Sequence, residues 1–138
     1  MQKVVIDTNV IVSAALSPAG NPAKIVNMIF DGEVQAYFCM EILVEYEEVL
    51  SRPEFNHKIE KRKTFMHNLM QIGVLSEPVT SGFLLPDESD RVFYDTAKGN
   101  GAILITGNIK HYPDEEFIMT PTEFISFLAA DNFILDRD

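Results

Sequence analysis

The sequence contains a single cysteine and no long apolar run. One cysteine makes no internal disulfide, and because Cys39 lies in the apolar run of residues 36–40, we expect a buried, inert thiol. No stretch approaches the length of a membrane span, and the N-terminus lacks the pattern of a signal peptide. These absences predict a globular protein of the reducing cytoplasm that has no membrane contact.

Positive charge is also scarce. The chain has 11 Lys and Arg against 21 Asp and Glu, a formal net charge of −10. This excludes a protein that holds nucleic acid mainly by attraction to phosphates, because that mode needs clustered Lys and Arg. It does not exclude a nucleic-acid enzyme, since acids gathered at one site and neutralised by divalent cations still accept phosphate.

The length of 138 residues suits one domain with a core that needs no disulfide or metal. We assign this domain to residues 1–128 and a C-terminal tail without clear periodicity to residues 129–138. Apolar strands alternate with amphipathic helices, as in a parallel sheet. The predicted strands are residues 3–6, 34–39, 74–79, 102–105 and 117–119, and the predicted helices are residues 10–16, 23–30, 41–50, 58–72, 87–98 and 121–128.

The first strand runs directly into Asp7. In open α/β sheets, ligands bind in the crevice beyond the carboxyl ends of the strands, so an acid at this position is a candidate site residue. The alternative is that Asp7 or Asn9 caps the helix that follows. The choice depends on whether other carboxylates reach the same place.

Metal-dependent hydrolysis of a phosphodiester needs several carboxylates that converge on small hard cations. The chain offers four groups of candidates. They are Asp7, the glutamates at positions 41, 45, 47 and 48, the aspartates at positions 87, 90 and 95, and the turn Thr106-Gly107-Asn108.

In the aspartate group, Asp90 lies in line with Phe93 and Ala97 and borders the inward face of its helix. Asp87 and Asp90 have the spacing of a capping box, so capping by Asp87 is the structural alternative. Asp95 flanks the other side of the inward face, where we expect a solvated surface acid, with metal ligation as the minor alternative.

In the glutamate group, periodicity does not choose between Glu45 and Glu47. They flank the apolar stripe of their helix about equally on its two sides. Glu41 and Glu48 point further outward, where solvation is the expectation.

The ordered set of these segments resembles a PIN domain. It comprises Asp7-Thr8-Asn9-Val10, the segment from Glu41 to Arg52-Pro53, residues 87–90 opening a helix, and Leu104-Ile105-Thr106-Gly107. More narrowly, the chain is similar to PIN-family proteins regarded as toxins of toxin–antitoxin pairs, relatives of the VapC ribonucleases. The likeness covers residues 3–128.

The resemblance implies a three-layer α/β/α sandwich with a central parallel sheet of four to five strands. It also implies an endoribonuclease that depends on Mg²⁺ or Mn²⁺ and leaves a 5′-phosphate. Asp7 matches the family's first acid, Glu45 the helix acid and Asp90 the acid of the later helix, so the resemblance selects Glu45 over Glu47. In a toxin, an antitoxin would mask the acidic cleft by placing Arg or Lys among the carboxylates.

Asn108 departs from the family, which usually has an acid at this position. An amide oxygen brings no negative charge, so a second metal would be held more weakly. Asp95 or Asp87 is the candidate to compensate. The alternative function is a catalytically weak PIN-like domain that binds RNA or a protein partner. A small-molecule phosphatase is disfavoured because Asn9 stands where such folds place a second Asp.

Four further positions have candidate roles beside the acids. Thr106 and Asn9 would orient the carboxylates, with turn formation and helix capping as the alternatives. Lys110 and His111 would meet phosphate or transfer a proton, with plain loop surface as the alternative. The helix from Val10 and the apolar residues near Phe127 and Phe133 are candidates for a homodimer contact, although core packing explains them equally well.

Overall fold

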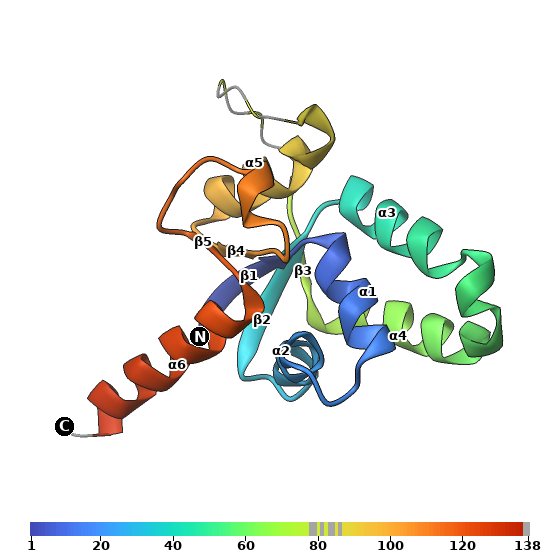
Figure 1. Cartoon of the computed structure of the whole chain (residues 1–138), viewed down its shortest axis with the longest axis horizontal. Coiled ribbons are helices and arrows are strands. Elements are labelled where there is room, and N and C mark those ends of the chain that lie inside the picture. The colour runs from blue at the N-terminus through green and yellow to red at the C-terminus, as the bar shows by residue number, and fades with distance from the viewer. Residues whose placement is uncertain (78–79, 81, 83–84, 86, 137–138) are drawn as a thin grey trace.

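The computed structural model, drawn in Figure 1, describes residues 1–77, 80, 82, 85 and 87–136. Five strands in this part of the chain form one sheet in the order β3-β2-β1-β4-β5, and all four pairings are parallel. The strands are β1 Gln2–Ile6, β2 Val34–Phe38, β3 Val74–Leu75, β4 Ile103–Ile105 and β5 Ile118–Met119. The predicted parallel sheet of four to five strands is therefore confirmed.

Helices cover both faces of this sheet. They are α1 Thr8–Leu16, α2 Asn21–Phe30, α3 Met40–Leu50, α4 Ile59–Ile72, α5 Arg91–Asn100 and α6 Pro121–Asp136, with the short 3-10 helices η1 Pro53–Lys58, η2 Glu88–Asp90 and η3 Ile109–His111. Figure 1 shows α5 above the sheet and α2 below it, and α5 packs on β1, β2 and β4. The architecture is the α/β/α sandwich that was predicted.

The two central strands form the middle of the core. In β1 and β4, Val4, Val5, Leu104 and Ile105 are completely buried, because helices cover both faces of the sheet. Burial on both faces explains why these strands read as continuous apolar runs rather than as alternating patterns. The predicted burial of Cys39 is also confirmed.

The connection from α4 into β3 depends on Gly73. A Cβ atom at this position would lie 2.6 Å from Cε2 of Phe38, which is too close for any side chain. The absence of a side chain at Gly73 therefore allows the backbone to approach β2. The strand predicted for residues 74–79 is seen as β3, Val74–Leu75, and residues 78 and 79 lie outside the described part of the chain.

The last helix is longer than the sequence analysis predicted. We expected it to end at Leu128 and to be followed by an irregular tail, but α6 continues to Asp136. Residues 129–136 contain no Pro or Gly, so nothing in their intrinsic preference ends the helix, even though their apolar residues follow no clear period. Among the described residues, no helix is both long and apolar enough to cross a membrane.

Candidate active site

The site begins where two neighbouring strands end together. Ile6 of β1 is in register with Ile105 of β4, so the next residues, Asp7 and Thr106, follow side by side. The Asp7 amide donates to the Ile105 carbonyl at 2.9 Å and extends the pairing by one residue. Asp7 directly precedes α1, but its side chain makes no capping hydrogen bond. The alternative that the Asp7 side chain caps the helix is therefore wrong.

Two hydroxyl groups hold the Asp7 carboxylate. Thr106 Oγ1 donates to Oδ2 of Asp7 at 2.9 Å, and Tyr112 Oη donates to the same oxygen at 2.8 Å. Thr106 is completely buried, and Asp7 is only 6% exposed. Burial raises the pKa of the Tyr112 phenol far above its usual range, and the charge of Asp7 adds to the shift, so the phenol stays a donor. Asp7 is therefore fixed in one orientation.

The turn after β4 is joined to α1 through Asn9. The amide N–H of Gly107 donates to Asn9 Oδ1 at 2.9 Å, and Asn9 Nδ2 lies 3.4 Å from Thr106 Oγ1. The N–H of Asn108 donates to Thr106 Oγ1 at 3.0 Å. Thr106 thus accepts from the turn while it donates to Asp7. Asn9 lies within the first turn of α1 and links it to this turn, rather than capping the helix.

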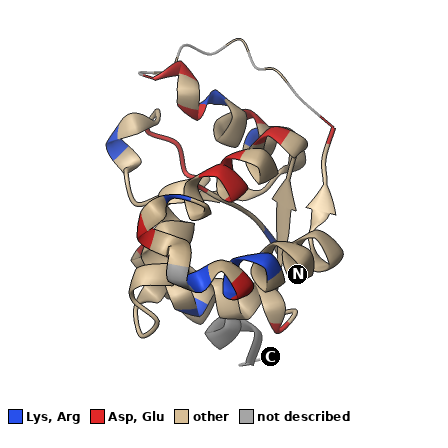
Figure 2. Cartoon of the chain, turned by 90° about the vertical axis from the view of Figure 1, so that its right-hand side faces the viewer, with Lys and Arg blue, Asp and Glu red and all other residues tan. Residues whose placement is uncertain are grey.

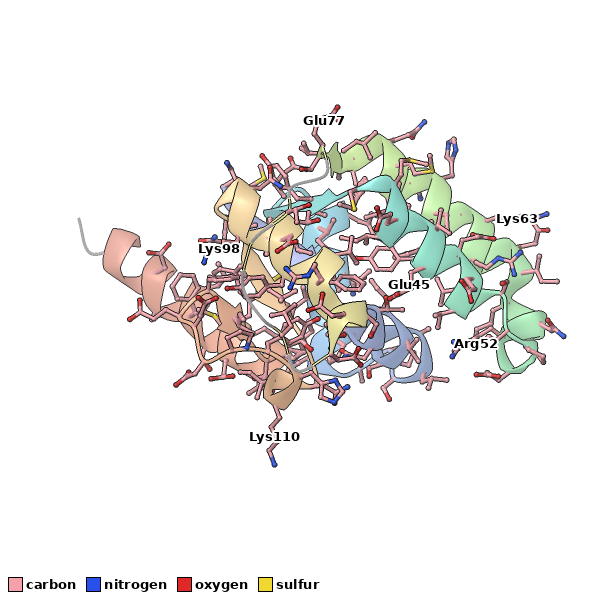
Figure 3. All side chains as sticks on the ribbon, turned by 90° about the horizontal axis from the view of Figure 1, so that it is seen from above. Glu45, Arg52, Lys63, Glu77, Lys98 and Lys110 are labelled. Atoms are coloured by element: carbon pink, nitrogen blue, oxygen red, sulfur yellow. The ribbon has the colours of Figure 1, made fainter. Side chains whose placement is uncertain are left out.

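Glu45 and Glu47, between which helical periodicity could not choose, have different partners in the structure. Glu45 accepts a hydrogen bond from the hydroxyl of Thr8, which follows Asp7. Figure 3 shows Glu45 pointing inward from α3. Glu47 instead lies 3.3 Å from Nε of Arg62 on α4. Glu45 therefore belongs with Asp7, and Glu47 belongs to a contact between two helices.

The position of α3 is itself fixed beside the end of β1. The buried hydroxyl of Tyr46 donates to the carbonyl of Ile6. Burial is the main reason that the pKa of Tyr46 is raised well above its usual range, and the charges of Asp7 and Glu45 add to the effect. Tyr46 thereby holds the segment that carries Glu45 against the strand that leads to Asp7.

The two aspartates with capping-box spacing have different environments. Asp87 accepts hydrogen bonds from the N–H and the hydroxyl of Ser89, which lower its pKa and cap η2. Asp90 makes no capping hydrogen bond with its side chain. Its Oδ2 is buried without a hydrogen-bond partner and lies 3.6 Å from Nδ1 of His111.

Three carboxylates share this region. Burial raises the pKa of Asp90, and the negative charges of Asp7, Asp87 and Glu45 raise it further, while His111 acts in the opposite direction. Mutual influence of this kind requires that the acids lie near one another in a poorly solvated place. Asp7 after β1, Glu45 on α3 and Asp90 at the end of η2 thus lie within range of one another's charges.

The remaining candidates in the loop after β4 are exposed. Asn108 and Lys110 lie on the surface, and Figure 3 shows Lys110 extending away from the molecule. His111 is also exposed, but it is the residue beside Asp90. Of the two basic residues considered together in the sequence, only His111 approaches the carboxylates.

The prediction that Asp95 is a solvated surface acid is wrong. Its side chain is 4% exposed, with Oδ2 at 3.6 Å from Nη1 of Arg91 and Oδ1 buried without a hydrogen-bond partner. The buried face of α5 is broader than an amphipathic stripe, because every residue from Phe93 to Ala97 is buried. Asp95 and Glu45 both line a cavity of about 490 Å³ between α3 and α5.

Sequence reasoning missed Tyr112, Thr8 and Tyr46. All three are hydroxyl donors to the acids or to the strand that presents them. Tyr112 lies in an irregular segment and Tyr46 on an apolar stripe, so neither gave a periodic signal. Thr8 and Tyr46 were detectable in principle, because they adjoin Asp7 and Glu45 in the sequence.

The donor chemistry at this site suits a small divalent cation. Carboxylate oxygens are the ligands that hard cations prefer, and the unpartnered Oδ2 of Asp90 has no protein donor to satisfy it. Within residues 1–77 and 87–136 and the three described positions between them, however, no group of three or more His, Cys, Asp or Glu side chains is close enough to hold an ion. Direct ligation by all three acids would therefore need side-chain movement or bridging water.

Comparison with known proteins identifies the family. The sequence profile described as PIN domain matches residues 3–110. The chain belongs to the PIN domain family. It is also 33% identical over 109 residues to the uncharacterized protein MJ1680 of Methanocaldococcus jannaschii, an alignment that covers 77% of this chain and 70% of the relative. PIN domains are commonly nucleases, so membership supports a nuclease-type function at the level of the family.

Proposed function

We propose that this PIN domain is an endoribonuclease that uses Mg²⁺ or Mn²⁺ held by Asp7, Glu45 and Asp90, directly or through water. The observation that carries the proposal is a buried Asp90 oxygen that has no hydrogen-bond partner, on a carboxylate that feels the charges of Asp7 and Glu45. Family membership supports the reaction class, since all three acids lie within residues 3–110, which the PIN profile spans.

The protein groups around the acids have distinct tasks in this proposal. A bound ion supplies Lewis acidity toward the phosphate and a lowered pKa for a water ligand. Thr106 and Tyr112 both bind Oδ2 of Asp7, so Oδ1 is the oxygen that these hydroxyls do not use. Thr8 orients Glu45 in the same way. Orientation of this kind is what metal-binding carboxylates generally need.

His111 is the candidate for proton transfer. It is exposed to solvent and lies 3.6 Å from Asp90, so it can exchange a proton with water and present it beside the acids. We do not assign Asn108 or Asp95 as a main ligand of the ion. Asn108 offers a neutral amide oxygen at the edge of the site, and Asp95 is already engaged with Arg91.

The second candidate function is a weak or inactive PIN domain that binds RNA or a protein. The neutral Asn108 and the absence of a preformed cluster of three ligands in the described residues favour it. A toxin role belongs to the ribonuclease proposal, and an antitoxin that masks the acids and a homodimer are its proposed partners. Phe127 on α6, which is 37% exposed, is available for a subunit contact.

Cleavage of labelled single-stranded RNA by the purified full chain tests the proposal. The reactions contain Mn²⁺, Mg²⁺ or EDTA, and an Asp7→Asn variant is prepared identically to control for contaminating nucleases. We expect cutting that needs the metal and disappears in the variant. Calorimetric titration with Mn²⁺ accompanies the assay. Metal binding without cutting across several RNAs would contradict the enzyme and favour the binding function.

A further inference from the structure

A second cavity lies at the opposite end of α1 from Asp7. It has a volume of about 320 Å³, is open to solvent and is lined by residues of α1, α2, α3, η1 and α4. None of the acids or hydroxyl donors of the candidate active site lines it. Its volume is at the lower end of the range for sites that bind small molecules. The cavity is therefore a separate place on the molecule with room for a ligand.

The walls of this cavity are mostly aliphatic and aromatic. They include Ile11 of α1, Val26 of α2, Leu50 of α3, Phe55 of η1 and Phe65 of α4. Such walls offer water few hydrogen-bond partners, whereas an apolar ligand that covers them removes hydrocarbon surface from water on both sides. The walls favour an occupant with a hydrocarbon body.

The rim on one side is basic. Lys58, Lys61 and Arg62 all line the cavity, so three of the 11 cationic residues of a chain with net charge −10 meet at one opening. Figure 2 shows Lys and Arg gathered on one helix in the lower half of the view, whereas Asp and Glu predominate in the upper half. This separation of charge gives the cavity a local preference for an anion.

The three cations are only partly satisfied by the protein. Lys58 Nζ donates to the carbonyl of Ala15 at 2.8 Å, which uses one of its three N–H groups. Arg62 Nε lies 3.3 Å from Oε1 of Glu47 and has no hydrogen bond of good geometry. Lys61 is exposed and makes no hydrogen bond or ion pair within the described part of the chain. Donors for an anionic group are thus available at the rim.

We propose that this cavity binds a small amphipathic anion, a free aliphatic carboxylate of medium chain length. Its chain lies against Ile11, Val26 and Phe65, and its carboxylate is bound at Lys58, Lys61 and Arg62. An RNA strand fits less well, because the apolar walls provide no partners for the polar edges of bases and the cations stand at one side only. The proposal is independent of the nuclease function, since the two sites share no residue.

Calorimetric titration of the full chain with decanoate, below its micelle concentration, tests the proposal. Decanol, which has the same chain without the charge, is titrated in parallel. We expect decanoate to bind with one-to-one stoichiometry and decanol to bind roughly tenfold more weakly, because charge-assisted hydrogen bonds at the rim are lost. Amide chemical shifts of the labelled protein should move in α1, η1 and α4.

Matched variants locate the site. Lys61→Met should weaken decanoate binding roughly tenfold, whereas Lys63→Met should leave it unchanged, because Lys63 is on the same helix but does not line the cavity. Figure 3 shows Lys63 extending outward from α4. Ala14→Leu fills the cavity from α1 and should abolish binding. Both lysines are exposed, so folding of these variants is not at risk.

Four results of these titrations, and a fifth from a competition with RNA, would overturn the proposal. They are no decanoate binding, equal binding of decanol, equal losses in Lys61→Met and Lys63→Met, and chemical shift changes confined to the region of Asp7. Displacement of decanoate by a short RNA would also overturn it, because the basic rim would then serve the nucleic acid. RNA cleavage is not the readout, so failure here is distinct from failure of the nuclease proposal.

Discussion

Thr106 donates a hydrogen bond of 2.9 Å to Asp7 across 99 positions of sequence, and the residue is completely buried. Its hydroxyl also accepts from the N–H of Asn108, so a single oxygen joins the strand end, the turn and the carboxylate. Four testable predictions follow from this arrangement and its surroundings.

Thr106→Val keeps the shape of the side chain but removes the hydroxyl. We expect the free energy of unfolding to fall by about 1–3 kcal/mol, because the buried partners lose a donor and an acceptor. RNA cleavage should fall as well, whereas Thr106→Ser should restore both. Urea unfolding and cleavage rates of the three proteins measure these effects. Full activity in Thr106→Val would show that Asp7 needs no orientation from this residue.

Glu45→Gln and Glu47→Gln form a matched pair on α3. Glu45 is bound by Thr8 beside Asp7, and Glu47 is paired with Arg62. We expect loss of metal-dependent cleavage in Glu45→Gln and close to full activity in Glu47→Gln, with less than about 1 kcal/mol of stability lost in the second because its ion pair is half-exposed. Equal activities in the two variants would exclude Glu45 from the chemistry.

Asn108→Asp introduces the acid that the resemblance to PIN domains led us to expect at this position. Because Asn108 is exposed, we expect little change in stability. The added charge should tighten Mn²⁺ binding, measured by calorimetry, and increase cleavage at low metal concentration. Asn108→Ser serves as the neutral control. If Asn108→Asp binds Mn²⁺ no more tightly than the unchanged protein, the ion does not reach this position.

Buried tyrosines give the protein a pH limit on the alkaline side. Burial, aided by the charge of Glu115, raises the pKa of Tyr94 to about 12, and burial raises the pKa of Tyr46 as well. In the unfolded chain the phenols of Tyr46 and Tyr94 ionise near the ordinary tyrosine pKa of about 10. Below about pH 10 the neutral phenols therefore make their full contribution to the stability of the folded protein. This contribution is lost as the pH rises from about 10 toward 12.

Urea unfolding at several alkaline pH values measures this loss, and absorbance near 295 nm follows the tyrosines directly. Tyr94→Phe should flatten the pH dependence without abolishing it, because Tyr46 and Tyr112 remain. Ionisation of all four tyrosines of the folded protein in one step near pH 10 would contradict the prediction.

Much of the fold followed from the order of apolar runs. β1 and β4 are buried on both faces, so their sequences carry few polar residues and are easy to recognise. The end of α6 was predicted wrongly, because its last residues have helix-compatible composition but no apolar period. Local pattern therefore predicts an element well where burial requires an apolar run or stripe, and less well where it requires neither.

The candidate site was predictable to a lesser degree. The strand end that carries Asp7 identifies the place, but the choice of Glu45 over Glu47 depends on which side of α3 faces α1, and no period of the helix contains that information. Burial of Asp95 depends on how closely α5 is enclosed, and the contact of Tyr112 depends on the path of an irregular loop. Each is decided by tertiary packing.

The pairing of β1 with β4 also has a consequence during synthesis on the ribosome. β1 is made before β4, and Thr106 and Tyr112 follow Asp7 by 99 and 105 positions. Until Thr106 and Tyr112 have both left the exit tunnel, Asp7 lacks at least one of its two hydroxyl donors, and the site is not fully assembled. The order of these segments therefore leaves the Asp7 carboxylate without its supporting hydroxyls while only β1, β2 and β3 have been made.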